Sequence, residues 1–248
     1  MIEPLRRLWR FLSEPLAVLA LTFCATTAVA QPFYVPSGSM EPTLQIGDAL
    51  IGSKFAYGYS RYSLPLPLGP HASFRLMERL PRRGDVVVFR LPRDPGVTYV
   101  KRVIGLPGDH VQMRQGRLVI NDVVVPLTPT GSGTVENEDG SLSPAPRFDE
   151  TLPGGASHPI FKMHWSGMLD DTPVFTVPSG DIFVMGDNRD NSLDSRVPAE
   201  AGGVGFVPVE NLVARADVTI GSYDFLNMRG PMSWPGLIRL TRFLHLVS

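Results

Sequence analysis

Between Glu14 and Glu41 the sequence carries no charged side chain, and the first part of this stretch is mostly apolar. Three arginines among the first ten residues precede it. A bilayer span takes about 20 residues, and basic flanks stay in the cytoplasm. We therefore expect a retained single-pass transmembrane helix over residues 15–35, with residues 1–14 cytoplasmic and the remainder across the membrane. The small residues Ala28–Ala30 also fit the cleavage site of a removable signal peptide, so this alternative stays open.

The composition narrows the class of the exported part. Lys and Arg together number 23 against 24 Asp and Glu, for a net charge of −1. A nucleic-acid partner normally requires a basic surplus, so the balance argues against one. The single cysteine excludes an internal disulfide framework and a multi-cysteine metal cluster. With 24 Gly and 24 Pro, turn-rich β structure is the first expectation.

Short apolar, β-branched runs separated by Gly, Pro and Asp predict a mainly β fold. The predicted strands are residues 49–52, 85–89, 97–104, 118–120, 123–125, 181–185 and 214–220. Residues 127–180 are expected to be an inserted loop or small subdomain, because much of this stretch is polar and rich in Gly and Pro. The core domain would then comprise residues 36–126 and 181–230. Residues 231–248 are predicted to be either an interfacial amphipathic tail or a segment packed on the core.

Ser39 lies in a Ser-, Gly- and Pro-rich segment, residues 35–44, immediately after the predicted anchor. A simple connecting turn would explain this string. A serine nucleophile on a tight turn would explain it too, because Gly38 allows close backbone approach and the Ser39 hydroxyl and amide would face a scissile carbonyl.

Lys101 is one of only three lysines, against twenty arginines. On a strand it shares a face with Val97, Tyr99 and Val103. If that face is buried, desolvation lowers the pKa of the amine, which can then take a proton from a serine. The alternative is an edge-strand lysine that extends to solvent.

The third segment, residues 186–196 (GDNRDNSLDSR), follows the predicted strand 181–185. It lacks the ligand spacing, the central Gly and the closing Glu of an EF-hand calcium loop. An Asx-turn loop that satisfies its own backbone explains the string. A supporting role in a site is the other interpretation, with hydroxyls that orient an amine and a bracing ion pair between Asp194 and Arg196.

Taken together, the strings PSGSMEPTL, GDVVVF, YVKRVIGLPGD and GDNRDNSLDSR resemble, in order, those of bacterial type I signal peptidase. The resemblance runs from Phe33 to about Ala216. It implies a signal-peptidase-like antiparallel β-sheet core on an N-terminal transmembrane helix. It also implies a serine endopeptidase of the bacterial inner membrane, with a periplasmic catalytic domain that cleaves signal peptides of preproteins after Ala-x-Ala.

The resemblance assigns roles to individual residues. Ser39 resembles the nucleophile, Lys101 the general base, and Ser37 the side-chain donor of the oxyanion hole. Ser192 resembles the residue that hydrogen-bonds the lysine, and Asp194 with Arg196 the structural pair beneath it. The resemblance implies no metal and no cofactor. The implied substrate-binding residues are Phe33, Val35, Pro36, Met40, Leu44, Val88, Tyr99 and Val100.

Two alternatives remain at this stage. One is a related Ser-Lys enzyme, either a specialised peptidase or a self-cleaving repressor domain; the anchor and the lack of a DNA-binding module count against the repressor. The other is a non-catalytic, membrane-anchored β domain that binds exported peptides. This second alternative requires Lys101 to be charged and exposed to solvent.

Overall fold

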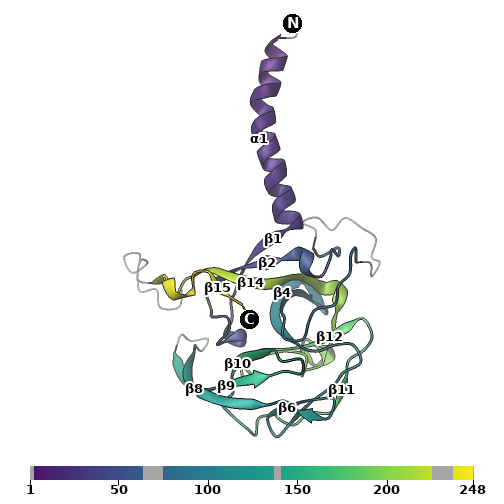
Figure 1. The fold of residues 1–248 in the computed structure, drawn as a ribbon, viewed down its shortest axis with the longest axis vertical. Coiled ribbons are helices and arrows are strands. Elements are labelled where there is room, and N and C mark those ends of the chain that lie inside the picture. Colours follow the sequence, from purple (N-terminus) through teal and green to yellow (C-terminus); the bar gives the residue numbers. More distant parts are fainter. Residues whose placement is uncertain (1–2, 64–74, 137–140, 225–236, 248) are drawn as a thin grey trace.

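The computed structural model describes residues 3–63, 75–136, 141–224 and 237–247 (Figure 1). One long helix, α1 (Glu3–Ala28), stands out from a body built of antiparallel strands, which confirms the mainly β prediction. The strands are β1 Ala30–Tyr34, β2 Asp48–Ser53, β3 Val86–Leu91, β4 Asp94–Gly105, β5 His110–Arg114, β6 Arg117–Ile120, β7 Val123–Val124, β8 Leu127–Glu136, β9 Leu142–Thr151, β10 Ser157–Phe161, β11 Phe175–Thr176, β12 Asp181–Met185, β13 Val207–Pro208, β14 Leu212–Ser222 and β15 His245–Leu246.

The largest sheet has the strand order β1-β2-β14-β3-β4-β12-β13, with β15 paired to β14. The sequence of strand β3 explains its central place in this sheet. Val87 and Phe89 belong to one buried apolar cluster, and Val86 and Val88 to another. Because side chains alternate across a strand, this apolar run buries both faces of β3 between two layers. Its pairing with β4 then sets the register Val87↔Lys101, which fixes the position of that lysine.

The predicted insert, residues 127–180, contains a three-stranded sheet in the order β10-β9-β8. The described strands of this stretch thus form a small sheet rather than an irregular loop. Its polar sequence fits a sheet whose strand β9 leaves most side chains partly or fully exposed. Near the end of the insert, β11 pairs with β5 of a separate four-stranded sheet, so the predicted boundary cuts through that second sheet.

The N-terminal prediction needs its boundaries corrected. The helix ends at Ala28, and residues 30–34 form β1, because their main-chain groups pair with β2 in the register Phe33↔Leu50. The predicted span 15–35 is thus part helix and part strand. The described apolar side chains of α1, among them Leu16, Leu19 and Leu21, are exposed. Among the helices that the structure describes, none combines the length and mean hydropathy of a membrane span.

The C-terminal segment is described from residue 237 to 247, so residues 231–236 and 248 of the predicted tail lie outside the described residues. The described part forms one 3-10 turn, Leu240–Arg242, and strand β15, not an amphipathic helix. It packs on the core, because β15 pairs with β14 and Arg242 forms an ion pair with Asp48.

Candidate active site

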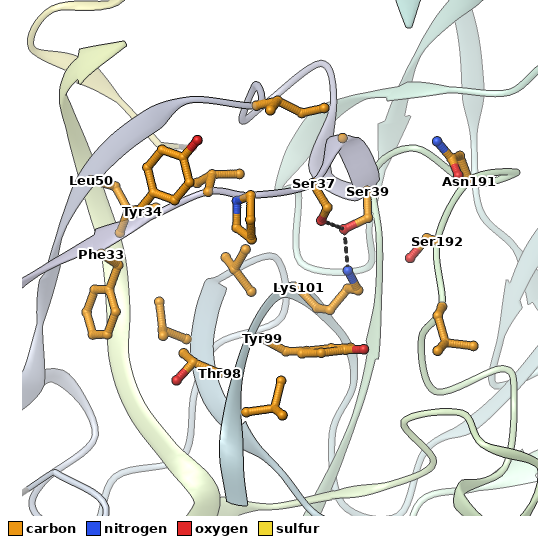
Figure 2. Close-up of a pocket in the computed structure, with 18 of the residues that line it drawn as sticks. Phe33, Tyr34, Ser37, Ser39, Leu50, Thr98, Tyr99, Lys101, Asn191 and Ser192 are labelled. Carbon is orange, nitrogen blue, oxygen red and sulfur yellow. Dashed lines mark hydrogen bonds between the residues drawn. The ribbon is translucent and has the colours of Figure 1, made fainter. Parts of the chain in front are cut away.

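Ser39 lies in a single 3-10 turn, Gly38–Met40, between β1 and β2, and all three residues of this turn are buried. Its Oγ is 3.4 Å from Ser37 Oγ. The turn therefore places two hydroxyls side by side at the wall of a cavity (Figure 2).

Lys101 reaches Ser39 from β4. Its Nζ donates a hydrogen bond of 2.5 Å to Ser39 Oγ, across 62 positions in the sequence. The lysine is 3% exposed, and its Nζ lies 5.5 Å from the centroid of the Tyr99 ring. The structure therefore brings together the two predicted catalytic residues, and Lys101 is buried rather than extended to solvent.

Burial lowers the pKa of Lys101 from its ordinary value of 10.5 to about 8. The carboxylates of Asp194 and Asp187 oppose this shift by favouring the charged ammonium, and the Arg196 guanidinium adds to it. Burial has the largest effect on this pKa, because removal of an ammonium from water disfavours its charged form. A substantial fraction of neutral amine is then present near pH 8, as a general base requires.

Ser192 lies beside this pair, in the loop 186–196 that follows β12, and its hydroxyl faces Ser39 and Lys101 (Figure 2). Its Oγ is buried and has no hydrogen-bond partner among the described residues, so the predicted bond to Lys101 is not formed. Glycine is required at position 186, where an added Cβ would lie 2.2 Å from Ser192 Oγ and 2.5 Å from the Ser39 carbonyl oxygen. The loop therefore packs directly against the nucleophile turn.

Asp194 and Arg196 form the predicted pair beneath this loop. The Arg196 guanidinium donates to Asp194 Oδ1 and Oδ2 at 2.9 and 2.8 Å, and the Gly186 amide donates to Oδ2 at 3.0 Å. Burial disfavours the charged carboxylate, but the Arg196 cation and these hydrogen bonds hold the pKa of Asp194 below its usual range. Arg196 also donates to the Arg189 carbonyl at 2.7 Å, which braces the loop from within.

A second buried pair was not predicted from the sequence. Arg102, next to Lys101 on β4, donates to both carboxylate oxygens of Asp187 at 2.9 and 2.7 Å. Thr43 donates to the same carboxylate at 2.5 Å. Asp187 thus ties together the nucleophile segment and the lysine strand. The signal available in the sequence was the position of Arg102 and Asp187 within the YVKRVIGLPGD and GDNRDNSLDSR strings.

Ser37, Ser39 and Lys101 line a cavity of about 980 Å³ between β1 and β4. Of the predicted substrate-binding residues, six line it: Phe33, Val35, Pro36, Val88, Tyr99 and Val100. Met40 and Leu44 do not, which corrects that prediction. Both are fully buried in the cluster that contains Leu50 and Val213, because they face the core side of the turn.

Further lining residues were missing from the predicted set: Pro32, Tyr34, Ile46, Leu50, Val97, Thr98, Asp190, Asn191 and Leu193. Val97 could have been found, because it shares the strand face of Tyr99 and Lys101. The others depend on how separate segments meet, which a local pattern does not contain.

The arrangement has the parts of an acyl-transfer site: a hydroxyl nucleophile, a buried amine as base, and a second hydroxyl beside the nucleophile. Within the described residues, no group of three or more His, Cys, Asp or Glu side chains could hold a metal ion.

The family model and the curated relatives that match this chain agree on one family. The family model described as signal peptidase, peptidase S26, matches residues 8–220. Signal peptidase I of Rickettsia akari (strain Hartford) is 41% identical over 206 residues, which cover 80% of this chain and 74% of the relative. The protein of the same name from Rickettsia prowazekii (strain Madrid E) is 42% identical over 206 residues, 80% of this chain and 75% of its own length. A solved signal peptidase I from Enterococcus faecalis V583 is 27% identical, with a TM-score of 0.31, and covers 55% of this chain and 97% of its own.

Proposed function

Since the chain belongs to the signal peptidase family, peptidase S26, we propose that it is a membrane-anchored serine endopeptidase that removes signal peptides from exported preproteins by a Ser-Lys dyad. The family assigns the enzyme class, signal peptidase I, a serine hydrolase. One observation carries the proposed mechanism, namely the 2.5 Å contact between Ser39 Oγ and the buried Lys101 Nζ.

In the acylation step, the neutral amine of Lys101 accepts the proton of the Ser39 hydroxyl. Ser39 Oγ then attacks the scissile carbonyl, and the leaving amine takes the proton back from Lys101 as the peptide bond breaks. The mature protein departs with its new amino terminus, while the signal peptide stays on Ser39 as an ester. Water then attacks this ester with Lys101 again as the base, which releases the signal peptide and restores the hydroxyl.

The negative charge that develops on the carbonyl oxygen needs donors. The Ser37 hydroxyl, 3.4 Å from Ser39 Oγ, and the Ser39 backbone amide are the proposed pair. One such donor contributes roughly 2.7–4 kcal/mol to transition-state stabilisation. In this scheme Ser192 orients the Lys101 amine once a substrate is bound, and the ion pair of Asp194 and Arg196 keeps its loop in place.

The cavity supports an extended peptide as substrate. Strand β4 pairs with β3 over Asp94–Arg102, but with β12 only over residues 102–105. On the side away from β3, residues 97–100 therefore have no strand partner within the described residues, and all four line the cavity. A substrate strand can add to that edge. Its side chains would then meet the apolar walls of Val35, Val88 and Val100, which leave room for small groups and favour Ala-x-Ala.

Anchoring is proposed through α1. Its described apolar side chains, such as Trp9, Leu19 and Leu21, are exposed to an extent unusual for a helix in water. Arginines concentrated near the N-terminus favour a cytoplasmic start. The catalytic domain would then lie on the periplasmic face of the inner membrane, where the lipid bilayer and the preprotein signal peptides are its partners.

The non-catalytic alternative fits less well. A peptide-binding domain has no use for a buried lysine in contact with a serine, and it requires a charged, exposed Lys101. The 3% exposure of Lys101 favours the dyad instead.

The test is cleavage of a purified preprotein with an Ala-x-Ala site by the full chain in detergent. Wild type is compared with Ser39→Ala, and with Ser157→Ala as a control, because Ser157 is an exposed serine on β10. We expect cleavage after the last Ala by wild type and the control, and a loss of more than about 10³-fold in Ser39→Ala.

Two results would count against the proposal. Full activity in Ser39→Ala would remove the nucleophile. An intact preprotein after incubation with wild type would favour a specialised peptidase or the binding domain.

A further inference from the structure

The loop 186–196 lies between the nucleophile turn and the three-stranded sheet β8–β10. On one side, the Asn188 amide donates to the Ser39 carbonyl, and Asn188 Nδ2 donates to the Gly38 carbonyl, both at 3.1 Å. On the other side, Phe161 at the end of β10 pairs in parallel with Asn188. The Phe161 amide donates to the Asp187 carbonyl, and the Arg189 amide donates to the Phe161 carbonyl, both at 3.0 Å. The small sheet is thus hydrogen-bonded to the loop 186–196, and this loop is hydrogen-bonded to the backbone of Ser39.

Two ion pairs also connect the small sheet region to this loop. Glu150 on β9 accepts two hydrogen bonds from the Arg189 guanidinium, at 2.6 and 2.5 Å, and both side chains are almost fully buried. Arg189 Nε also donates to the Gly186 carbonyl at 3.2 Å, so the guanidinium joins Glu150 to the start of the loop. Close by, Lys162 forms an ion pair with Asp190 of the same loop.

The contacts of Glu150 reach the lysine strand as well. His158 Nε2 is 3.5 Å from Glu150 Oε2 and 3.9 Å from Asp187 Oδ1, with all three side chains buried. Asp187 in turn holds Arg102, the neighbour of Lys101. A displacement of Glu150 would therefore be felt at both partners of the dyad.

We propose that Glu150 is a positioning residue of the peptidase: through Arg189 it fixes the loop 186–196, so that Asn188 holds the backbone of Ser39 in its reactive geometry. This inference rests on the proposed function, which supplies the reaction whose rate is measured. Glu150 lies in the small sheet, outside all four strings of the resemblance, and touches neither the nucleophile nor the cavity.

The substitution Glu150→Gln tests the proposal, because it keeps the shape of the side chain but faces the Arg189 N–H groups with an amide that carries its own donors. We expect kcat to fall about 10- to 100-fold, as small misplacements of reacting groups do. KM should change less than kcat, because most of the residues that line the cavity belong to segments other than the loop 186–196. Asp149→Asn is the matched control. It makes the same chemical change one position earlier, on the opposite face of β9, and should behave as wild type.

A merely structural role would change the amount of folded enzyme but not kcat per folded molecule, so circular dichroism fixes the folded fraction of every variant. A double-mutant cycle with Asn188→Ala adds a second readout. If Glu150 acts through the loop, the changes in activation free energy calculated from kcat for the two single variants do not add up to that of the double variant. Additive losses, or a wild-type kcat per folded molecule in Glu150→Gln, would overturn the proposal.

Should Glu150→Gln fail to fold, Glu150→Asp takes its place. It keeps the charge but is too short to make both bonds to Arg189, so its kcat must also fall; a wild-type kcat in folded Glu150→Asp overturns the inference. Failure of the proposed function looks different, since wild type itself would then not cleave the preprotein.

Discussion

Two buried lysines, one in the core domain and one in the small sheet region, have opposite surroundings. Lys101 on β4 contacts the Ser39 hydroxyl, and no carboxylate of the described residues forms an ion pair with it. Lys162, just after β10, forms ion pairs with Asp170 and Asp190. Both are at most 3% exposed, and both lie within 6 Å of an aromatic ring centroid, at 5.5 Å for Lys101 and 5.8 Å for Lys162. Burial and an aromatic neighbour are therefore shared, and the direct partners make the difference.

The groups in direct contact with a buried lysine decide whether it can act as a base or serves as a structural cation. A buried ammonium without a contacting carboxylate is destabilised, so the amine loses its proton more easily. Two carboxylates in contact compensate the same ammonium and commit it to holding chain segments together. In the proposed mechanism, the buried lysine of the core domain is the base, whereas the ion pairs of Lys162 hold chain segments together in the small sheet region.

The largest contrast is expected from the same substitution at both positions. Lys101→Met should lower turnover more than about 10³-fold, because the base is lost. Lys162→Met should instead lower the free energy of unfolding by about 3–5 kcal/mol, because Asp170 and Asp190 remain without their cation. Cleavage assays and thermal unfolding on both variants measure the two effects.

Each variant is the control for the other. An equal loss of turnover in folded Lys162→Met and in Lys101→Met would contradict the difference between the two lysines. So would cleavage by Lys101→Met at the wild-type rate, in which case another base must act on Ser39.

A second test is the pH dependence of cleavage. The pKa of Lys101, lowered by burial to about 8, belongs to the free enzyme. Only the neutral amine accepts a proton, so kcat/KM should fall about tenfold for each pH unit below that pKa and level off above it. Rates of cleavage of a short Ala-x-Ala peptide between pH 6 and pH 10 give the profile. A flat profile through pH 8 would mean that an ionisation other than that of Lys101 governs the reaction.

The sequence predicted the mainly β core well, because its strands are apolar, β-branched and bounded by turn residues. Strand β3 is an example, since residues 85–89 were predicted and Val86–Leu91 is observed. The contact between Ser39 and Lys101 could be predicted only through the resemblance, because the 62 positions between the residues carry no local signal of proximity.

The missed features share one physical cause. Strands β8 and β9 have polar, Pro-rich sequences, and their pairing depends on a long hairpin register that hydropathy does not indicate. Likewise, Met40 has the apolar character of a pocket residue, but the turn directs it to the core. Which side of a turn faces the substrate depends on tertiary packing, and local propensity does not determine it.

His158 refines the rule drawn from the two lysines, because it lies near two carboxylates and still favours its neutral form. Burial lowers the pKa of this imidazole from 6.5 to about 4, and the guanidinium of Arg102 adds to the effect; the carboxylates of Asp187 and Glu150 oppose it but already pair with arginines. A carboxylate therefore stabilises the charged form of a buried base only if it is not already paired with another cation.

The smallest expected effect follows from this pKa. Above pH 6.5 the imidazole is neutral in both the folded and the unfolded chain. As pH falls below 6.5, the unfolded chain binds a proton that the folded chain still refuses. Unfolding then becomes easier by up to about 1.4 kcal/mol per pH unit, or roughly 3 kcal/mol down to pH 4. Buried carboxylates such as Glu150, whose pKa in the folded chain is lowered, add their own loss of stability once pH falls below their ordinary value, which is 4.5 for Glu150. Urea unfolding from pH 7 to pH 4 measures how steeply the free energy of unfolding falls with pH.

The substitution His158→Gln should flatten this slope. His164→Gln should not, because His164 is exposed. An unchanged slope in His158→Gln would show that the nearby carboxylates offset the burial of His158 and leave the pKa of its imidazole at its ordinary value, which would contradict the rule.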